Sequence, residues 1–251
     1  MKLMDIKKQI LGEGVNDPGI FKAIFLAGGP AAGKTFVARE IFGLPPREDS
    51  IITFAPSGLK LITSDTAFEV LLKKAGYGTD LDKIAQKDPN LFLSLTDREN
   101  PDSVRNRAKR ITKERITHYI DGRLGVVIDG TGHLYSHVSE MREKLTHLGY
   151  DTYMVYVNTK LDVALQRNTS RARRLPDDLV KQSWNDAQKN MKNYQRLFGG
   201  NIIIIDNSEI AIGRTGQIFQ KDTYKAINKF ISKPIHSNIA KLWIEAQRRA
   251  K

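Results

Sequence analysis

The stretch "AGGPAAGKTF" at residues 27–36 follows the apolar run "IFKAIFL" at residues 20–26. Gly28, four intervening residues and then Gly33, Lys34 and Thr35 have the spacing of a loop that cradles phosphate groups. Glycine lets backbone N–H groups approach phosphate oxygens closely, and a helix that starts here adds its positive end. We expect Lys34 to reach the β- and γ-phosphates of a nucleotide and the Thr35 hydroxyl to hold Mg²⁺. The expected nucleotide-binding residues are Gly28, Gly29, Pro30, Ala31, Ala32, Gly33, Lys34, Thr35 and Phe36.

Composition limits the class of protein. The chain has 251 residues, of which 40% are hydrophobic, and this is enough for one domain with a full core. It has no cysteine, which excludes disulfide bonds and cysteine-based metal sites. The longest purely aliphatic run, the isoleucines at 202–205, is far too short to span a bilayer. We therefore expect a soluble, cytoplasmic protein with no membrane partner, and nothing in the sequence indicates its oligomeric state.

The charge is strongly positive and unevenly distributed. The formal net charge is +12, and residues 214–251 hold nine lysines and arginines against Asp222 and Glu245, which gives this segment +7. A basic segment of this kind attracts DNA, RNA or another polyanion. A helix with a solvated basic face has the same composition, so both interpretations stay open.

Apolar segments alternate with helical ones along the chain. Short apolar runs predict strands, and apolar residues three and four apart predict helices. The expected strands are 20–27, 59–63, 124–129, 151–158 and 201–206, and the expected helices are 33–42, 66–76, 102–122, 136–149 and 176–198. Between them, residues 77–101 are polar and predict an insertion with one short helix. The alternation predicts an α/β fold with a five-stranded parallel sheet that helices cover on both faces.

Two aspartates follow expected strands at the edge where parallel sheets bind ligands. Asp65 comes after the second strand, where a carboxylate can accept the proton of an attacking hydroxyl. The alternative is an ordinary helix start, because Ser64, Asp65 and Thr66 precede an apolar run. Asp129 comes after the third strand and has the position of an acidic residue that holds Mg²⁺ directly or through water.

The segment after Asp129 contains further polar groups. Gly130 and Gly132 would let the backbone approach a ligand, and Thr131 and His133 would line it, although a plain tight turn has the same sequence pattern. The expected substrate-binding residues are Asp65, Asp129, Gly130, Thr131 and His133, and the expected metal ligands are Thr35 and Asp129.

Four arginines lie between the fourth and fifth strands, at positions 167, 171, 173 and 174. If the preceding helix continues through them, Arg167, Arg171 and Arg174 share one face. Guanidinium groups suit the oxygens of a transferring phosphoryl group, and a solvated basic helix is the alternative. A motor ATPase more often takes its arginine from a neighbouring subunit, so a local cluster favours phosphoryl transfer.

Five segments together resemble the zeta-toxin group of P-loop kinases: "GGPAAGKT", "ITSDTAF", "VVIDGTGH", "LTHLGYDTYMVYVN" and "ARRLPDDLV". The resemblance covers residues 20–208. Polynucleotide kinases are more distant relatives, and uncharacterised phage-encoded kinases are also similar. The resemblance implies a kinase-type P-loop core, which we expect to span residues 1–210. Residues 211–251 lie outside the resemblance, and we expect them to form a basic helical extension. The resemblance also implies that a mobile lid at residues 167–176 closes over the nucleotide.

The resemblance assigns roles residue by residue. It implies that Lys34 and Thr35 hold phosphate and Mg²⁺, that Asp65 is the base, and that Arg167 acts with Arg173 or Arg174. Two positions depart from the relatives: zeta toxins have Glu in place of Asp129, and polynucleotide kinases have Arg in place of Phe68. The expected catalytic residues are Lys34, Asp65, Arg167, Arg171, Arg173 and Arg174.

The leading hypothesis is a kinase that moves the γ-phosphate of ATP, or another NTP, to a hydroxyl of a nucleotide-containing acceptor. This acceptor is either a nucleotide sugar or a nucleic-acid hydroxyl, at a 5′ end or on a hydroxymethylated base. Residues 77–123 would form the acceptor wall, where the stripe Arg105, Lys109 and Lys113 meets either an anion or solvent. An NTP-hydrolysing motor or switch, and a nucleic-acid-binding module with a kinase-like core, are the alternatives.

Overall fold

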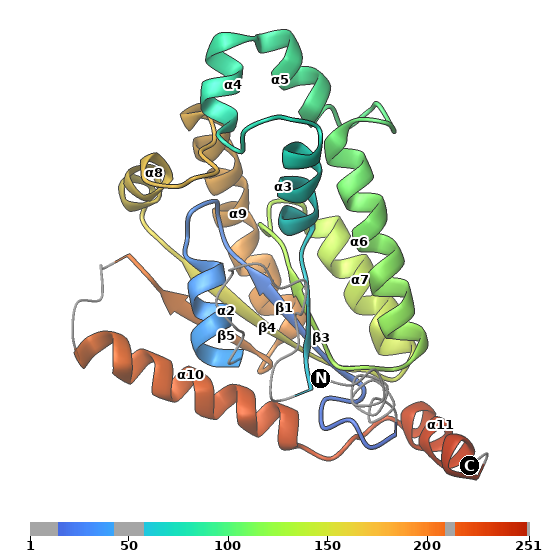
Figure 1. Cartoon of the computed structure of the whole chain (residues 1–251). Coiled ribbons are helices and arrows are strands. Elements are labelled where there is room, and N and C mark those ends of the chain that lie inside the picture. The colour runs from blue at the N-terminus through green and yellow to red at the C-terminus, as the bar shows by residue number, and fades with distance from the viewer. Residues whose placement is uncertain (1–14, 43–57, 209–213, 250–251) are drawn as a thin grey trace, which may run out of the picture.

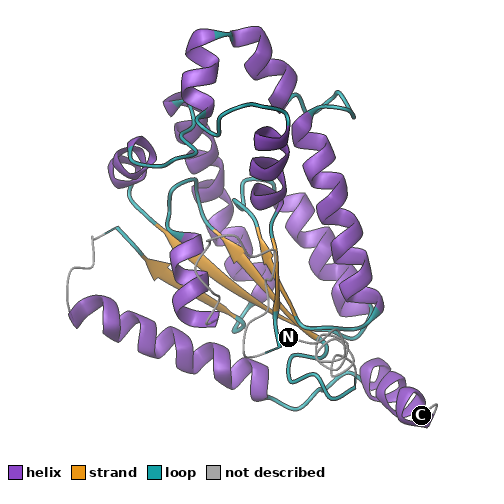
Figure 2. Cartoon of the chain, in the orientation of Figure 1, coloured by secondary structure: helices purple, strands orange, loops and turns teal. Residues whose placement is uncertain are grey.

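The computed structural model describes residues 15–42, 58–208 and 214–249. Its five strands form one parallel sheet in the order β2-β3-β1-β4-β5. The strands are β1 (Lys22–Ala27), β2 (Lys60–Ile62), β3 (Val126–Asp129), β4 (Asp151–Asn158) and β5 (Ile202–Asp206). The predicted five-stranded parallel sheet is therefore confirmed, and Figure 2 shows it enclosed by helices.

Helices connect the strands and cover both faces of the sheet (Figure 1). They are α2 (Lys34–Phe42), α3 (Ser64–Lys74), α4 (Leu81–Lys87), α5 (Pro89–Thr96), α6 (Val104–Asp121), α7 (Tyr135–His147), α8 (Leu161–Thr169), α9 (Asp177–Phe198), α10 (Arg214–Ser232) and α11 (Asn238–Arg249). None of the helices in the described part of the chain is both long and apolar enough to cross a membrane.

Strand β1 lies at the centre of the sheet, and all of its residues are buried. Leu26 is in register with Asp129 of β3 on one side and with Val155 of β4 on the other. After β1 the chain forms β2 and β3 on one side of β1, and it then crosses over to form β4 and β5 on the other side. In parallel sheets this reversal opens a crevice at the carboxyl end of the central strand. The phosphate-loop sequence follows β1 directly and so lies in that crevice.

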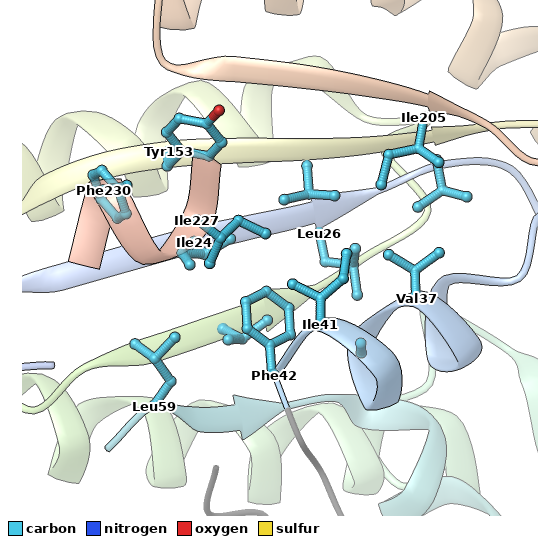
Figure 3. Close-up of a cluster of buried hydrophobic side chains, with 14 of the residues drawn as sticks. Ile24, Leu26, Val37, Ile41, Phe42, Leu59, Tyr153, Ile205, Ile227 and Phe230 are labelled. Atoms are coloured by element: carbon cyan, nitrogen blue, oxygen red, sulfur yellow. The ribbon is translucent and has the colours of Figure 1, made fainter. Parts of the chain in front are cut away.

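The alternation of side chains along β1 divides the core into two layers. Ile24 and Leu26 point to the face covered by α2 and α10, where they meet Ile41 and Phe230 (Figure 3). Phe25 points to the opposite face and joins a second cluster with side chains from α6, α7, α9 and α11. A third cluster links α3, α4, α5 and α6 beside the crevice; its buried members are Phe68, Leu72, Leu81, Leu95 and Ala108.

The insertion at residues 77–101 differs from the prediction because it contains two helices, α4 and α5, instead of one. Asp88 ends α4 and caps α5, since its side chain accepts a hydrogen bond from the Leu91 N–H at 2.9 Å. Pro89 takes the first position of α5, where its missing N–H is not needed. The Asp-Pro pair is therefore a junction between two helices.

The helix that precedes the arginine cluster does not continue through it, because α8 ends at Thr169. The buried side chain of Asn168 donates to the Leu175 carbonyl at 2.7 Å and accepts from the Leu175 N–H at 3.1 Å. These two bonds replace helical hydrogen bonds and fold residues 170–175 back as a loop. Arg171 and Arg174 consequently share no helical face with Arg167.

The C-terminal region is helical, as predicted, and it packs against the core. Phe230 of α10 is buried in the first cluster, and Trp243 of α11 contacts Phe21 with ring centroids 5.6 Å apart. Lys22, at the amino end of β1, donates to the Lys233 carbonyl at 2.9 Å. This region therefore reaches the amino ends of the strands, away from the crevice (Figure 1). The expected domain boundary at residues 210–211 lies outside the described residues.

Candidate active site

A cavity of about 750 Å³ opens at the carboxyl end of the sheet. Residues 30–35 of the phosphate loop line it, together with Asp65 and Asp129. Helices α3, α5, α6 and α9 and the arginine loop at residues 170–175 supply the other walls. The volume falls within the range of small-molecule sites, which is about 300–1,000 Å³.

The phosphate loop requires glycine at two positions. Gly28 has φ +147°, and a Cβ there would lie 2.2 Å from the Val157 carbonyl oxygen. Gly33 has φ +89°, and a Cβ there would lie 2.3 Å from the side-chain amide of Asn207. That amide donates to the Ala32 carbonyl at 2.8 Å, so the residue after β5 holds the loop in place. The loop leads into α2, whose N-terminal N–H groups suit an anion. Gly28, Gly29 and Phe36 themselves do not line the cavity.

Lys34 is folded back over the loop that carries it. Its Nζ donates to the carbonyls of Gly28 at 2.9 Å and Gly29 at 3.1 Å. Burial lowers the pKa of Lys34, although the neighbouring carboxylates Asp129 and Asp65 act in the opposite direction. The ammonium group is thus close to the two acids and in a position from which it can turn to bound phosphates.

Asp65 lies in the first turn of α3, where its N–H donates to the Thr63 hydroxyl at 3.3 Å. Its carboxylate accepts from Arg173 Nη2 at 2.5 Å and from Arg105 Nη1 at 3.2 Å. Burial alone would raise the pKa of Asp65. The positive charge and hydrogen bond of Arg173 outweigh this effect, and the charges of Arg105 and Lys34 add to them, so the pKa of Asp65 lies well below its ordinary value. The carboxylate is therefore ionised at neutral pH and can accept a hydrogen bond from a hydroxyl.

These ion pairs predict a loss of stability in acid. The pKa of Asp65 is lower in the folded state than in the unfolded state. The ionised carboxylate therefore stabilises the fold at pH values above the unfolded-state pKa of roughly 4. This stabilisation is lost as the pH falls toward the folded-state pKa. We expect the wild type to have a higher Tm than Asp65→Asn at about pH 6, and the difference to shrink below about pH 4. Thermal unfolding followed by circular dichroism measures this; a Tm difference that acid leaves unchanged would contradict it.

Asp129 ends β3 with a buried oxygen, Oδ1, that has no hydrogen-bond partner. Burial raises the pKa of Asp129 to about 6, while the charge of Lys34 and a hydrogen bond with Thr63 act to lower it. Thr35 lines the same cavity. An orphaned carboxylate oxygen and a hydroxyl beside a phosphate loop fit Mg²⁺, which prefers oxygen ligands. The described residues contain no group of three or more acidic, His or Cys side chains for a metal, so water and phosphate would complete the coordination.

The segment after Asp129 is held by α9. The Gly132 carbonyl accepts from the Tyr194 hydroxyl at 2.8 Å and from Asn190 Nδ2 at 3.2 Å, and Asn190 also donates to the His133 carbonyl at 2.9 Å. Thr131 and His133 line the cavity, whereas Gly130 does not. Tyr194 and Asn190 both lie on the helix that was expected at 176–198, and neither was predicted as a site residue. Their sequence distance from residue 132 explains why these contacts were missed.

Helix α8 and the arginine loop together bring three of the four predicted arginines to the cavity. Arg167, Arg171 and Arg173 line it, and Arg167 Nη1 donates to the Thr159 hydroxyl at 3.3 Å. Arg174 does not line the cavity, because its Nε faces Asp82 of α4 at 3.2 Å. The arrangement therefore supports a role near the nucleotide for three arginines and places Arg174 outside that group.

The arginine loop is attached to the insertion instead of to the phosphate loop. The Thr79 hydroxyl donates to the Ala172 carbonyl at 3.1 Å, and the Leu81 N–H donates to the Arg174 carbonyl at 3.0 Å. Leu175 packs against the third hydrophobic cluster. The arginine loop and the α3–α6 side of the cavity are thus joined by both polar and apolar contacts.

Arg98 and Arg105 also line the cavity and were not among the predicted site residues. Arg105 was expected only as part of a basic stripe with Lys109 and Lys113, and neither lysine lines the cavity. The sequence gives no direct signal that α6 packs against α3, which is the contact that brings Arg105 to Asp65.

A family model described as an AAA domain matches residues 24–194. A solved structure from the PezAT chromosomal toxin–antitoxin system of Streptococcus pneumoniae is 14% identical, with 90% of this chain and 94% of that chain covered and a TM-score of 0.52. Shikimate kinase from Bacteroides thetaiotaomicron is 14% identical over 84% of this chain and 99% of its own, with a TM-score of 0.42. Shikimate kinase from Acinetobacter baumannii, in complex with shikimate, is 18% identical over 83% and 94%, with a TM-score of 0.40. No curated protein matches the chain. The family match and the sheet order together show a P-loop kinase-like α/β fold.

Proposed function

Because the chain belongs to the AAA-domain family, we propose that it is an ATP-dependent phosphotransferase that acts on a hydroxyl of a nucleotide-containing acceptor. One observation carries the proposal: the carboxylate of Asp65 lines the same cavity as the phosphate loop, with arginines beside it. A loop that binds phosphate for structure or signalling alone has no need of that carboxylate. Phosphoryl transfer needs both groups close together.

The loop and its neighbours would hold the triphosphate. Backbone N–H groups at the start of α2 suit the phosphate oxygens, and Lys34 would exchange its two carbonyl partners for the β- and γ-phosphates. Thr35 and Asp129 would hold Mg²⁺, which neutralises charge that develops on the phosphate oxygens. Arg167 and Arg171, which line the same cavity, would face the same oxygens.

Asp65 would accept the proton in the transfer step. The acceptor hydroxyl oxygen forms a bond to the γ-phosphorus, the bond from that phosphorus to the β–γ bridging oxygen breaks, and ADP leaves with the electron pair. The hydroxyl proton passes to the Asp65 carboxylate. Because the transition state is loose, this proton moves late, and a carboxylate with a low pKa can position the hydroxyl. Arg173 would then stabilise charge on the transferring group.

The walls of the cavity support an acceptor that contains a nucleotide. Phe92 and the exposed Leu93 of α5 offer apolar surface, and Arg98 and Arg105 lie on the same side of the molecule. Nucleotides combine a flat apolar base with phosphate, and aromatic and arginine side chains recognise these two parts. Nucleotide sugars and nucleic-acid ends both fit this description.

Separate measurement of ADP and free phosphate tests this proposal. Protein incubated with ATP and Mg²⁺ should form ADP in excess of free phosphate only when a suitable acceptor is added. Rapid and equal formation of ADP and phosphate without acceptor would instead support an NTP-hydrolysing motor or switch. No ADP under any condition, together with salt-sensitive DNA affinity, would support a nucleic-acid-binding module.

A further inference from the structure

Three nitrogen-bearing side chains gather on the side of the cavity where the acceptor would bind: Arg98, Arg105 and His133. They come from the loop after α5, from the first turns of α6 and from the loop after β3. The inference below rests on the proposed function, because it concerns the acceptor of that same reaction.

Arg98 is fixed through its backbone while its side chain is exposed. The Asn106 side chain donates to the carbonyls of Asp97, Arg98 and Asn100 at 3.2, 3.0 and 2.7 Å. The Ser103 hydroxyl donates to the Asp97 carbonyl at 2.6 Å. Among the described residues, Arg98 has no ion-pair partner. A fixed loop thus presents an uncompensated guanidinium at the edge of the cavity.

Arg105 lies between this edge and Asp65. Its Nη1 is 3.2 Å from Asp65 Oδ1, and its guanidinium lies over the Phe68 ring at 5.2 Å. A guanidinium has five N–H donors, so Arg105 can hold Asp65 and still bind another anion. Burial lowers the pKa of the adjacent Lys109, and the positive charges of Arg105 and Arg98 add to this effect. Like charges at this density favour an anionic ligand that relieves their repulsion.

His133 adds a buried donor. Its Nδ1 pairs with the Thr131 hydroxyl, and its Nε2 is buried without a hydrogen-bond partner. Burial, with the charges of Arg98 and Arg105 among the further causes, lowers the pKa of His133, so the ring is neutral at pH 7. When the hydroxyl donates to Nδ1, the ring proton is on Nε2 and can be donated to a ligand oxygen. The nearby carboxylate, Asp186, pairs with Lys189 at 3.4 Å.

We propose that Arg98, Arg105 and His133 form an anion subsite that holds a phosphate group of a small acceptor whose hydroxyl lies at Asp65. Arg105 belongs to the subsite and also pairs with Asp65, so the phosphate and the reacting hydroxyl would lie on neighbouring parts of the acceptor. A ligand without an oxygen at this place would leave the buried His133 Nε2 unpaired, and a site with an unpaired buried polar group discriminates against such a ligand.

A small acceptor is favoured over a nucleic acid by the position of the basic C-terminal helices. Helices α10 and α11 lie at the opposite end of the molecule from α4 and α5 (Figure 1). Phe230 of α10 packs against the side chain of Lys22, and Trp243 of α11 contacts Phe21, both at the amino end of β1. None of the described lysines and arginines of these two helices lines the cavity, so the charges that meet the acceptor there come from Arg98 and Arg105.

Binding of inorganic pyrophosphate tests the subsite directly. The protein is first saturated with Mg²⁺ and a non-hydrolysable ATP analogue, so that the phosphate loop is filled, and pyrophosphate is then titrated by calorimetry. We expect one equivalent to bind to the wild type and Arg98→Gln to weaken binding by at least about tenfold, as for a lost charge-assisted hydrogen bond. Arg107→Gln is the control, because Arg107 is an exposed arginine of α6 that does not line the cavity. No binding to the wild type, or equal binding by Arg98→Gln, would overturn the subsite.

Transfer assays separate this inference from the proposed function. Preferred transfer to phosphate-bearing small acceptors, with a KM that Arg98→Gln raises and Arg107→Gln does not, supports the subsite. Transfer to phosphate-free acceptors that is equally efficient in Arg98→Gln would overturn the subsite and leave the kinase function intact. Arg98-dependent pyrophosphate binding without transfer to any acceptor would overturn the kinase function alone. Transfer only to DNA or RNA ends would overturn the proposal that the acceptor is a small molecule.

Discussion

Lys34→Ala is expected to abolish nucleotide-dependent activity, with a loss on the order of 10³-fold or more, because a charged donor to the transferring phosphate is removed. The side chain is half-buried near Asp65 and Asp129, and its Nζ contacts the carbonyls of the loop itself. Alanine would leave the loop backbone in place, since Cβ is already present in lysine. The loss of activity should therefore come from the missing positive charge beside the β- and γ-phosphates and not from a collapsed loop.

Steady-state rates of ADP formation measure this effect, with Lys73→Ala as the matched control. Lys73 is an exposed lysine of α3 and does not line the cavity, so its removal should leave the rate unchanged. Circular dichroism and Tm values establish that the Lys34→Ala protein is folded. A folded Lys34→Ala protein with more than about a tenth of the wild-type rate would show that the loop does not act on the triphosphate.

Asp65→Asn is expected to keep ATP binding and to lower transfer by a factor on the order of 10² or more, as for the loss of a general base. Asparagine preserves the shape of the side chain and can still face Arg105 and Arg173, so the cavity should keep its form. It cannot accept a proton from a hydroxyl at neutral pH. The expected signature is a lower kcat with an almost unchanged Kd for ATP.

Glu69→Gln distinguishes this chemical role from a structural one. Glu69 lies one turn after Asp65 on α3 and also pairs with Arg173, at 3.3 Å, but it does not line the cavity. If Asp65 only anchored Arg173, the two variants should lose comparable activity. If Asp65 accepts the proton, Glu69→Gln should retain most of the transfer rate while Asp65→Asn loses it.

The central part of the fold could be predicted because its signals are local. An apolar strand, a glycine loop and a helix follow one another within residues 22–42, and the alternation of later strands and helices determines a parallel sheet. Asp65 and Asp129 could be placed at one edge for the same reason, because the carboxyl ends of parallel strands meet there. The helix expected at 102–122 was found as well: it is α6, with Ser103 as its N-terminal cap and Gly122 as its C-terminal cap.

The acceptor side could not be predicted, because it depends on contacts between distant segments. Arg105 meets Asp65 only when α6 packs against α3, and Asn168 ends α8 through a bond to Leu175 that sequence patterns do not encode. The polar residues 77–101 predicted one short helix, whereas Asp88 and Pro89 form the junction between two. Side chains that position other groups, such as Asn190 and Asn207, carry no motif of their own.

The most direct test of the account is where the γ-phosphate of ATP goes. Wild type, Asp65→Asn and Glu69→Gln would be incubated with γ-labelled ATP and Mg²⁺ in the presence of nucleotide sugars, phosphorylated small molecules, 5′-hydroxyl DNA and RNA, and hydroxymethylated DNA. The account predicts that label appears on one class of acceptor with wild type and Glu69→Gln, and falls by about 10² or more with Asp65→Asn. Label found only as free phosphate across the panel, at equal rates in wild type and Asp65→Asn, would contradict it.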